Sequence, residues 1–200
     1  MTNREEWLTD GMYELERVLF KPQGETLPTK IRVSCSWPSS RAGGKNKAGS
    51  VVGQCHYPTS SADQTTEIVI SQSQDDPIEV LAILAHEMIH AIKGSQAGHG
   101  KLFKRLALAI GLDGKQPDGK LLMTSTVASE AFKQSVQPII DNLGPYPHAS
   151  VDLSQRKKQS TRLVKCECTA CGYIARTTTK WIDTIGAPLC ACNSEPMEVK

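Results

Sequence analysis

The chain has 200 residues, of which 39% are apolar and 22% charged, and its formal net charge is +2. This composition is typical of a globular protein and is large enough for one medium domain with a small appendage. No apolar stretch approaches the roughly 20 residues that a membrane helix needs, and the acidic start of the sequence does not resemble a signal peptide. We therefore expect a cytoplasmic protein with no membrane partner.

The first third of the chain predicts one helix and three short strands. Apolar residues recur at helical spacing from Arg4 to Leu19, and Pro22 follows soon after this segment, which indicates an amphipathic helix. Three segments rich in β-branched and aromatic residues predict strands, at Ile31–Trp37, Val51–Tyr57 and Glu67–Ser71. Strands this short and this close in sequence suggest a small, mostly antiparallel sheet.

The helix with the clearest signals begins after Asp76, which can cap its N-terminus, and ends at Lys93 before a glycine. The segment is apolar on nearly every side, as in a helix buried in a core. Three ionisable residues interrupt it, namely His86, Glu87 and His90. They need an explanation, because burying such groups without partners is costly.

His86, Glu87 and His90 form the pattern H-E-x-x-H. Residues four apart share a face of a helix, so both imidazoles can bind one metal ion. Glu87 lies beside them and can act as the base in metal-assisted hydrolysis. A third ligand is needed, and His99, nine residues after His90, is the candidate at the start of a helix predicted to reach Ile110. The alternatives are an accidental match and a capping role for His99.

The last third of the chain predicts a domain boundary. A helix expected at Ser129–Leu143 is followed by the sequence Gly-Pro-Tyr-Pro at 144–147, which is typical of a break between domains. The segment 154–160 is polar and basic, as in a linker. We therefore predict an α+β domain at residues 1–146, a basic linker at 147–163 and a small separate domain at 164–200.

Five of the seven cysteines lie in the last 35 residues, a clustering that suggests metal binding more than disulfides in a chain without an export signal. Cys168-x-x-Cys171 followed by Cys190-x-Cys192 is typical of a zinc ribbon with one structural zinc ion. Cys166 is a spare cysteine that could replace Cys168. A unit this small has little core, so the metal would hold it folded.

The same tail could bind nucleic acid. Residues 151–200 carry eight Lys/Arg and five Asp/Glu, and Tyr173 and Trp181 could stack on bases. Four zinc-bound thiolates would offset this charge, so the charge argument is weak. The alternative is a solvated linker and a tryptophan that fills the ribbon core. A second basic segment, Arg41–Lys47, lies in a predicted loop and could contact DNA or cover a cleft.

From Ile68 to Leu112 the sequence resembles the SprT-like metalloproteases, the family that includes Spartan. The resemblance rests on two motifs, His86-Glu87-x-x-His90-Ala91 and Gly98-His99-Gly100-x-x-Phe103. It implies a zincin-like fold with a catalytic zinc ion on the three histidines, Glu87 as the catalytic residue, and DNA-associated or DNA-crosslinked proteins as substrates. In metzincins, by contrast, the third histidine follows the second by six residues.

Two functions from different classes follow from these motifs. The first is a zinc metalloendopeptidase with one catalytic and one structural zinc ion, acting on a protein substrate and recruited by single-stranded or damaged DNA. The second is a nucleic-acid-binding or transcription-associated protein that uses the zincin domain as a scaffold, a role that does not require Glu87. A peptidase with one narrow target and no DNA role is a third possibility. In the peptidase, we expect the strand Glu67–Ser71 to pair with the substrate backbone at a sheet edge, with low sequence specificity.

Overall fold

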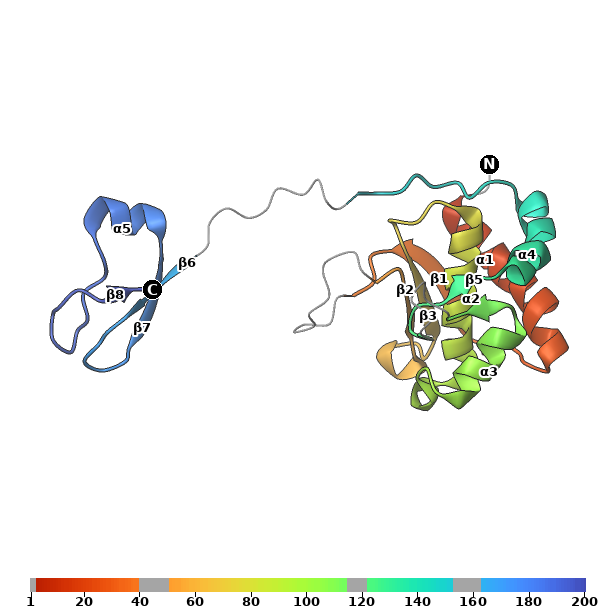
Figure 1. Cartoon of the computed structure of the whole chain (residues 1–200), viewed down its shortest axis with the longest axis horizontal. Coiled ribbons are helices and arrows are strands. Elements are labelled where there is room, and N and C mark those ends of the chain that lie inside the picture. The colour runs from red at the N-terminus through yellow and green to blue at the C-terminus, as the bar shows by residue number, and fades with distance from the viewer. Residues whose placement is uncertain (1–2, 40–50, 115–121, 153–162) are drawn as a thin grey trace. The chain divides into compact units, whose positions relative to one another are not determined.

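The computed structural model describes residues 3–39, 51–114, 122–152 and 163–200. The basic loop Arg41–Lys47 and the linker segment 154–160 lie outside these ranges. The chain divides into two compact units, residues 1–153 and 154–200, and each is described by itself (Figure 1). Within the described ranges, no helix combines the length and the apolar character needed to cross a membrane.

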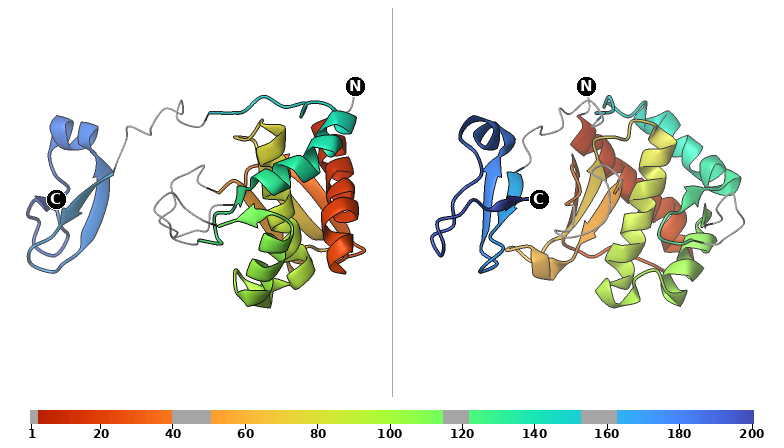
Figure 2. Two further views of the ribbon diagram at one scale, coloured as in Figure 1. Left: turned by 45° about the vertical axis from the view of Figure 1, so that its right-hand side comes forward. Right: turned by 60° about the vertical axis from the view of Figure 1, so that its left-hand side comes forward.

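The first unit packs its helices against one side of a three-stranded sheet (Figure 2). The strand order is β1 (Ile31–Ser36), β3 (Thr66–Ser71), β2 (Gly53–His56). β3 is parallel to β1 over six residue pairs and antiparallel to β2. The prediction of a mostly antiparallel sheet is therefore wrong for the longest pairing. β3 fills the gap between two strands of opposite direction, so it must be parallel to one of them.

The N-terminal helix is confirmed, with α1 (Arg4–Leu15) continuing into a π-helical turn (Glu16–Phe20). Asn3 caps it through a reciprocal pair of hydrogen bonds: its side chain accepts from the Glu6 amide at 2.9 Å, and its own amide donates to the Glu6 carboxylate at 3.0 Å. One face of α1 is buried in the core of the unit, through residues Trp7, Leu8, Met12 and Leu15.

The central helix is α2 (Pro77–Lys93), which contacts α1, the two later helices of the first unit and the strands β2, β3 and β5 (Val127–Ala128). Asp76 caps it as predicted, since its side chain accepts a hydrogen bond from the Glu79 amide at 2.9 Å. Most of its side chains are buried, His86 and Glu87 among them. α2 is thus the element around which the first unit is packed.

The elements after α2 complete the helical layer. α3 (Lys101–Ala109) is followed by β4 (Leu112–Asp113), which pairs antiparallel with β5 (Val127–Ala128). The predicted helix at 129–143 is confirmed as α4 (Glu130–Leu143). Ser129 caps it by accepting a hydrogen bond from the backbone amide of Phe132 at 3.3 Å.

The chain continues to pack against the first unit beyond residue 146, the predicted end of the first domain. Tyr146 is buried against Trp7, with their ring centroids 4.9 Å apart. The His148 ring contacts the carbonyl oxygen of Gln72 at 3.0 Å, and the amide of Val151 donates to the same oxygen at 2.8 Å. The structure therefore places residues 147–152 in the first unit and not in the linker.

The second unit is a small antiparallel sheet in the order β7 (Ile174–Thr178), β6 (Leu163–Glu167), β8 (Glu198–Val199), with the short helix α5 (Thr179–Ile185) after β7. The core of the unit is small, with three cysteines and Met197 buried at its centre. Trp181 is 50% exposed, so the alternative in which it fills this core is wrong.

Candidate active site

The structure brings the three predicted histidines together. α2 places His86 and His90 one turn apart on the same face. The Nε2 atom of His99 lies 3.2 Å from that of His86 and 3.1 Å from that of His90. The ligand atoms of all three residues lie within 4.8 Å of one another.

A glycine-rich turn returns His99 to the end of α2. Gly94 and Gly98 have φ angles of 76° and 46°, a region that glycine enters without steric cost. His99 itself precedes α3, whose N-cap is Gly100. The expectation that His99 lies in the first turn of the helix is therefore wrong, and the turn positions it from outside the helix.

The three imidazoles fit a zinc ion. Tetrahedral zinc with nitrogen ligands at about 2.0–2.1 Å needs those nitrogens roughly 3.4 Å apart, close to the separations seen here. Burial, reinforced by the neighbouring histidines, lowers the pKa of His86 to about 3 and that of His90 to about 4. Burial also lowers the pKa of His99. Low pKa values favour the neutral imidazole, which is the form that binds metals.

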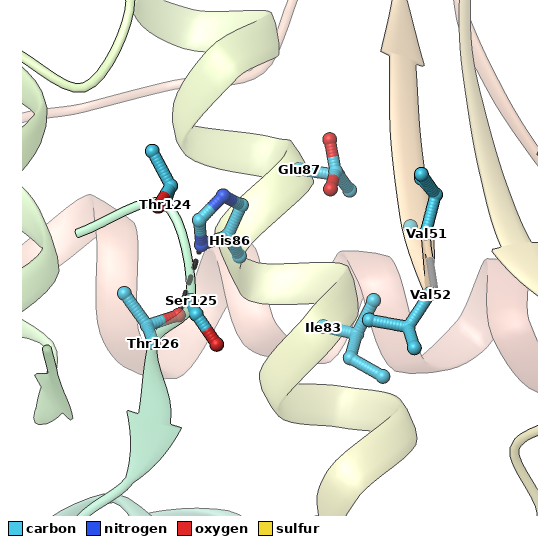
Figure 3. Close-up of a pocket in the computed structure, with 9 residues that line it drawn as sticks. Val51, Val52, Ile83, His86, Glu87, Thr124, Ser125 and Thr126 are labelled. Carbon is cyan, nitrogen blue, oxygen red and sulfur yellow. Dashed lines mark hydrogen bonds between the residues drawn. The ribbon is translucent and has the colours of Figure 1, made fainter. Parts of the chain in front are cut away.

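Two neighbouring side chains hold these imidazoles in place. Phe103 is fully buried, and its ring centroid lies 4.7–4.8 Å from those of all three histidines. Thr126 contacts the outer nitrogen of His86, with 2.9 Å between Nδ1 and Oγ1 (Figure 3). When His86 Nδ1–H donates to this hydroxyl, the Nε2 lone pair is free for a metal.

Glu87 faces the cleft that contains the histidines. It is 7% exposed, and together with all three histidines it lines a cavity of about 490 Å³. Strand β2 approaches it closely because Gly53 has no side chain. A Cβ atom at Gly53 would lie 2.8 Å from Glu87 Oε1 and 2.5 Å from Ile83 Cγ2, so any larger residue would displace one of them.

Burial raises the pKa of Glu87 to about 8, opposed by a hydrogen bond from the backbone of Cys55. The Cys55 thiol beside it is also affected: burial and the Glu87 charge raise its pKa to about 12. A nearby cation would favour the carboxylate form of Glu87. A carboxyl group with a pKa near neutrality can both accept and release a proton at physiological pH.

The strand beside the cleft is β2 and not β3. β3 lies in the middle of the sheet, so it has no free edge, and the expectation that Glu67–Ser71 pairs with substrate is wrong. Among the described residues, β2 is paired on one side alone. It contributes Gly53 and Cys55 to the cleft wall, and Tyr57 follows it there.

The second unit gathers four sulfur atoms. Cys168 Sγ lies 3.6 Å from Cys192 Sγ, and Cys171 Sγ lies 3.6 Å from Cys190 Sγ. Tetrahedral zinc with sulfur ligands at about 2.3 Å needs sulfurs roughly 3.8 Å apart, so the set fits zinc and leaves no ligand position for water. Cys166 is buried in the core of the unit and is not part of this group.

Within the cysteine set, Cys168 is the residue whose surroundings favour the charged form that a metal requires, whereas hydrogen bonds with the neighbouring thiols raise the pKa of Cys192. Hydrogen bonds from the backbone amides of Cys171 and Ala170 lower the pKa of the Cys168 thiol. All the cysteines are free of disulfides. The two predicted ligand sets are therefore both assembled, and each is consistent with metal binding.

Local sequence patterns did not reveal three residues of the site, namely Gly53, Tyr57 and Thr126. Each reaches the cleft from a segment distant in sequence from α2. Gly53 and Tyr57 lie in the predicted second strand, but nothing in that strand indicates which residues face the helix. Thr126 stands in a run of hydroxyl residues, Thr124–Thr126, that has no distinguishing motif.

The fold and the site define a mixed α+β protein with an H-E-x-x-H helix and a third histidine from a following turn. A family model, the SprT-like family, matches residues 16–120, which is slightly more than half of the chain. The protein therefore belongs to the SprT-like family, as the motifs predicted. Membership of this family suggests a function of the zinc metalloprotease type. No curated protein and no solved structure matches the chain.

We expect Thr126→Val to weaken zinc binding at the histidine site about 10-fold to 100-fold, because the outer nitrogen of His86 loses its acceptor. Thr126→Ser keeps the hydroxyl and should bind zinc nearly as tightly as the unaltered protein. Stepwise titration against a chromophoric chelator measures both sites in one experiment. Equal affinity of the valine variant and the unaltered protein would show that the hydroxyl does not position His86.

We expect Glu87→Gln to stabilise the metal-free protein at pH 8 by about 1–3 kcal/mol. The Glu87 pKa is about 8 in the folded state and about 4.3 in an unfolded chain. Between these values the folded protein binds a proton that the unfolded chain has lost, so stability falls as pH rises. Glutamine does not ionise, so the variant does not lose this stability as pH rises.

Urea denaturation of the metal-free protein at pH 5 and pH 8 measures the effect, which should shrink towards pH 5. Glu79→Gln is the matched control, because Glu79 is exposed on the same helix. An identical pH dependence of stability in the Glu87→Gln variant and the unaltered protein would contradict the burial argument.

Proposed function

We propose that the protein is a zinc-dependent endopeptidase with a zincin-like catalytic domain and a structural zinc ribbon. The observation that carries this proposal is the convergence of three imidazoles beside Glu87, in a cleft bounded by an edge strand. His86, His90 and His99 would hold a catalytic zinc ion, and the four cysteines of the second unit a structural one. When bound at the histidines, zinc polarises the substrate carbonyl and makes water a better nucleophile.

Glu87 is the proposed general base. It would take a proton from the attacking water and deliver it to the amide nitrogen of the leaving chain, so that the C–N bond breaks as the new acid and amine form. Glu87 is buried in the cleft wall, away from bulk water. Its raised pKa suits both accepting the proton from water and delivering it to the leaving amine. Gly53 lets the edge strand approach this carboxyl group.

The edge of β2 would hold the substrate in extended form. Backbone pairing to a strand edge depends little on side chains, so we propose that most substrate positions are read weakly. The low sequence specificity is the one expected from the sequence, but the strand that pairs with the substrate is β2 and not β3.

We further propose that the substrates are proteins bound or crosslinked to DNA and that the second unit binds single-stranded DNA. Tyr173 and Trp181 are 60% and 50% exposed, and the Lys180 ammonium lies 5.3 Å from the centroid of the Trp181 ring. Exposed aromatic rings of this kind stack on unpaired bases. Stacking supports this proposal more than charge does, because Lys165 and Lys200 both form ion pairs with Glu167.

We expect the zinc-loaded full chain to cleave an unstructured protein substrate, and single-stranded DNA to stimulate the cleavage. Glu87→Gln should lower the rate at least about 100-fold, because general base catalysis contributes on that scale. Trp181→Ala should lose the stimulation by DNA. Tyr13→Ala is the matched control, because Tyr13 is 52% exposed in the first unit, and this variant should keep both activities.

The possible results separate the competing functions. Cleavage that ignores DNA would remove the DNA proposal and favour a peptidase with a narrow target. No cleavage by protein that contains two zinc ions per chain, together with tight and salt-sensitive DNA binding, would instead support the nucleic-acid-binding or transcription-associated protein.

A further inference from the structure

A second pocket lies beside Glu87 and extends one turn towards the N-terminus of α2, to Ile83. It has a volume of about 360 Å³ and shares residues His86, Glu87, Gly53 and Thr124 with the cleft that contains the three histidines. The two hollows therefore adjoin each other. Figure 3 shows its walls, with hydroxyl residues on one side of the helix and valines on the other.

We propose that this pocket is a substrate subsite that accepts one apolar side chain, such as that of Leu, Ile, Met or Phe. The proposal rests on the endopeptidase function given above and adds a preference at a single substrate position. Pockets for small ligands have volumes of roughly 300–1,000 Å³, so this one lies at the small end. It suits one side chain and is too small for a folded partner.

The valine wall and the base of the pocket favour an apolar occupant. Val51 and Val52 form one wall and Ile83 the base. Val52 is 37% exposed, so an apolar side chain placed against it would remove apolar surface from water on both partners. Glu87 is the one charged group in the described lining. A carboxylate entering the pocket would meet Glu87, and any charged group would leave water for aliphatic contacts.

The edge strand explains why a single substrate side chain would enter. The carbonyl of Val52 accepts a hydrogen bond from the Ser71 amide at 2.9 Å, so Val52 extends β2 by backbone pairing to β3. A peptide paired along the free edge of β2 would pass this point in extended form. Successive side chains of an extended peptide point to opposite faces, so the neighbours of the inserted residue would point away from the pocket.

The opposite wall is fixed to the metal-binding residues. Thr126 contacts His86 Nδ1 at 2.9 Å, and Thr124 lines both the pocket and the cleft. The pocket is therefore held at a constant position relative to His86 and Glu87. An inserted side chain would fix the register of the peptide and so choose which amide bond lies at Glu87.

The test is a set of peptides that differ at one position, cleaved by the zinc-loaded full chain. We expect kcat/KM to be about 10-fold or more higher with Leu than with Gly or Asp at the preferred position. Val52→Trp fills the pocket and should reverse the order of Leu and Gly. Val199→Trp is the matched control, because Val199 is 47% exposed in the second unit, and it should keep the preference for Leu.

Binding of the same peptides to the Glu87→Gln protein, measured by fluorescence anisotropy, separates this proposal from the endopeptidase function. Tighter binding of the Leu peptide than of the Gly peptide, lost in a Val52→Trp, Glu87→Gln double variant, supports the pocket even without cleavage. Equal binding of the Leu and Gly peptides would overturn it, whatever the cleavage assay shows.

Discussion

The structure of the first unit depends on helix α2 carrying two imidazoles and a carboxyl group into its core. Such groups are costly to bury without partners, and the neighbouring elements supply a contact partner for each of them. Thr126 contacts His86, and the backbone of β2 contacts Glu87. The turn after α2 brings His99 within 3.2 Å of both other imidazoles, in an arrangement that one zinc ion would satisfy. The same burial that makes these groups costly keeps the histidines neutral and raises the Glu87 pKa.

The second unit also gathers a set of metal-binding side chains, but there the set compensates for a small core. Its core holds three cysteines and Met197, too little apolar surface to stabilise a fold of this size. The four sulfurs at its centre fit a metal with no position left open for water. In the first unit the histidine set leaves a ligand position that a substrate or water could take. The two sites thus divide into one suited to chemistry and one suited to stability.

The sequence predicted what depends on local or regularly spaced residues. The cap at Asp76, the helical spacing of His86 and His90 and the four clustered cysteines can all be read along the chain, and so can the SprT-like family. It did not predict the order of the strands, because the insertion of β3 between β1 and β2 is a property of the whole sheet. For the same reason it missed Gly53 and Thr126, which reach the site through tertiary packing.

The central claim is that His86, His90 and His99 bind one zinc ion beside Glu87. X-ray diffraction from crystals of the zinc-loaded full chain, recorded on both sides of the zinc absorption edge, tests it most directly. We expect two anomalous peaks, one bounded by three imidazole Nε2 atoms and one by four sulfurs. A single peak at the cysteines, with the histidines unliganded in zinc-saturated crystals, would contradict it.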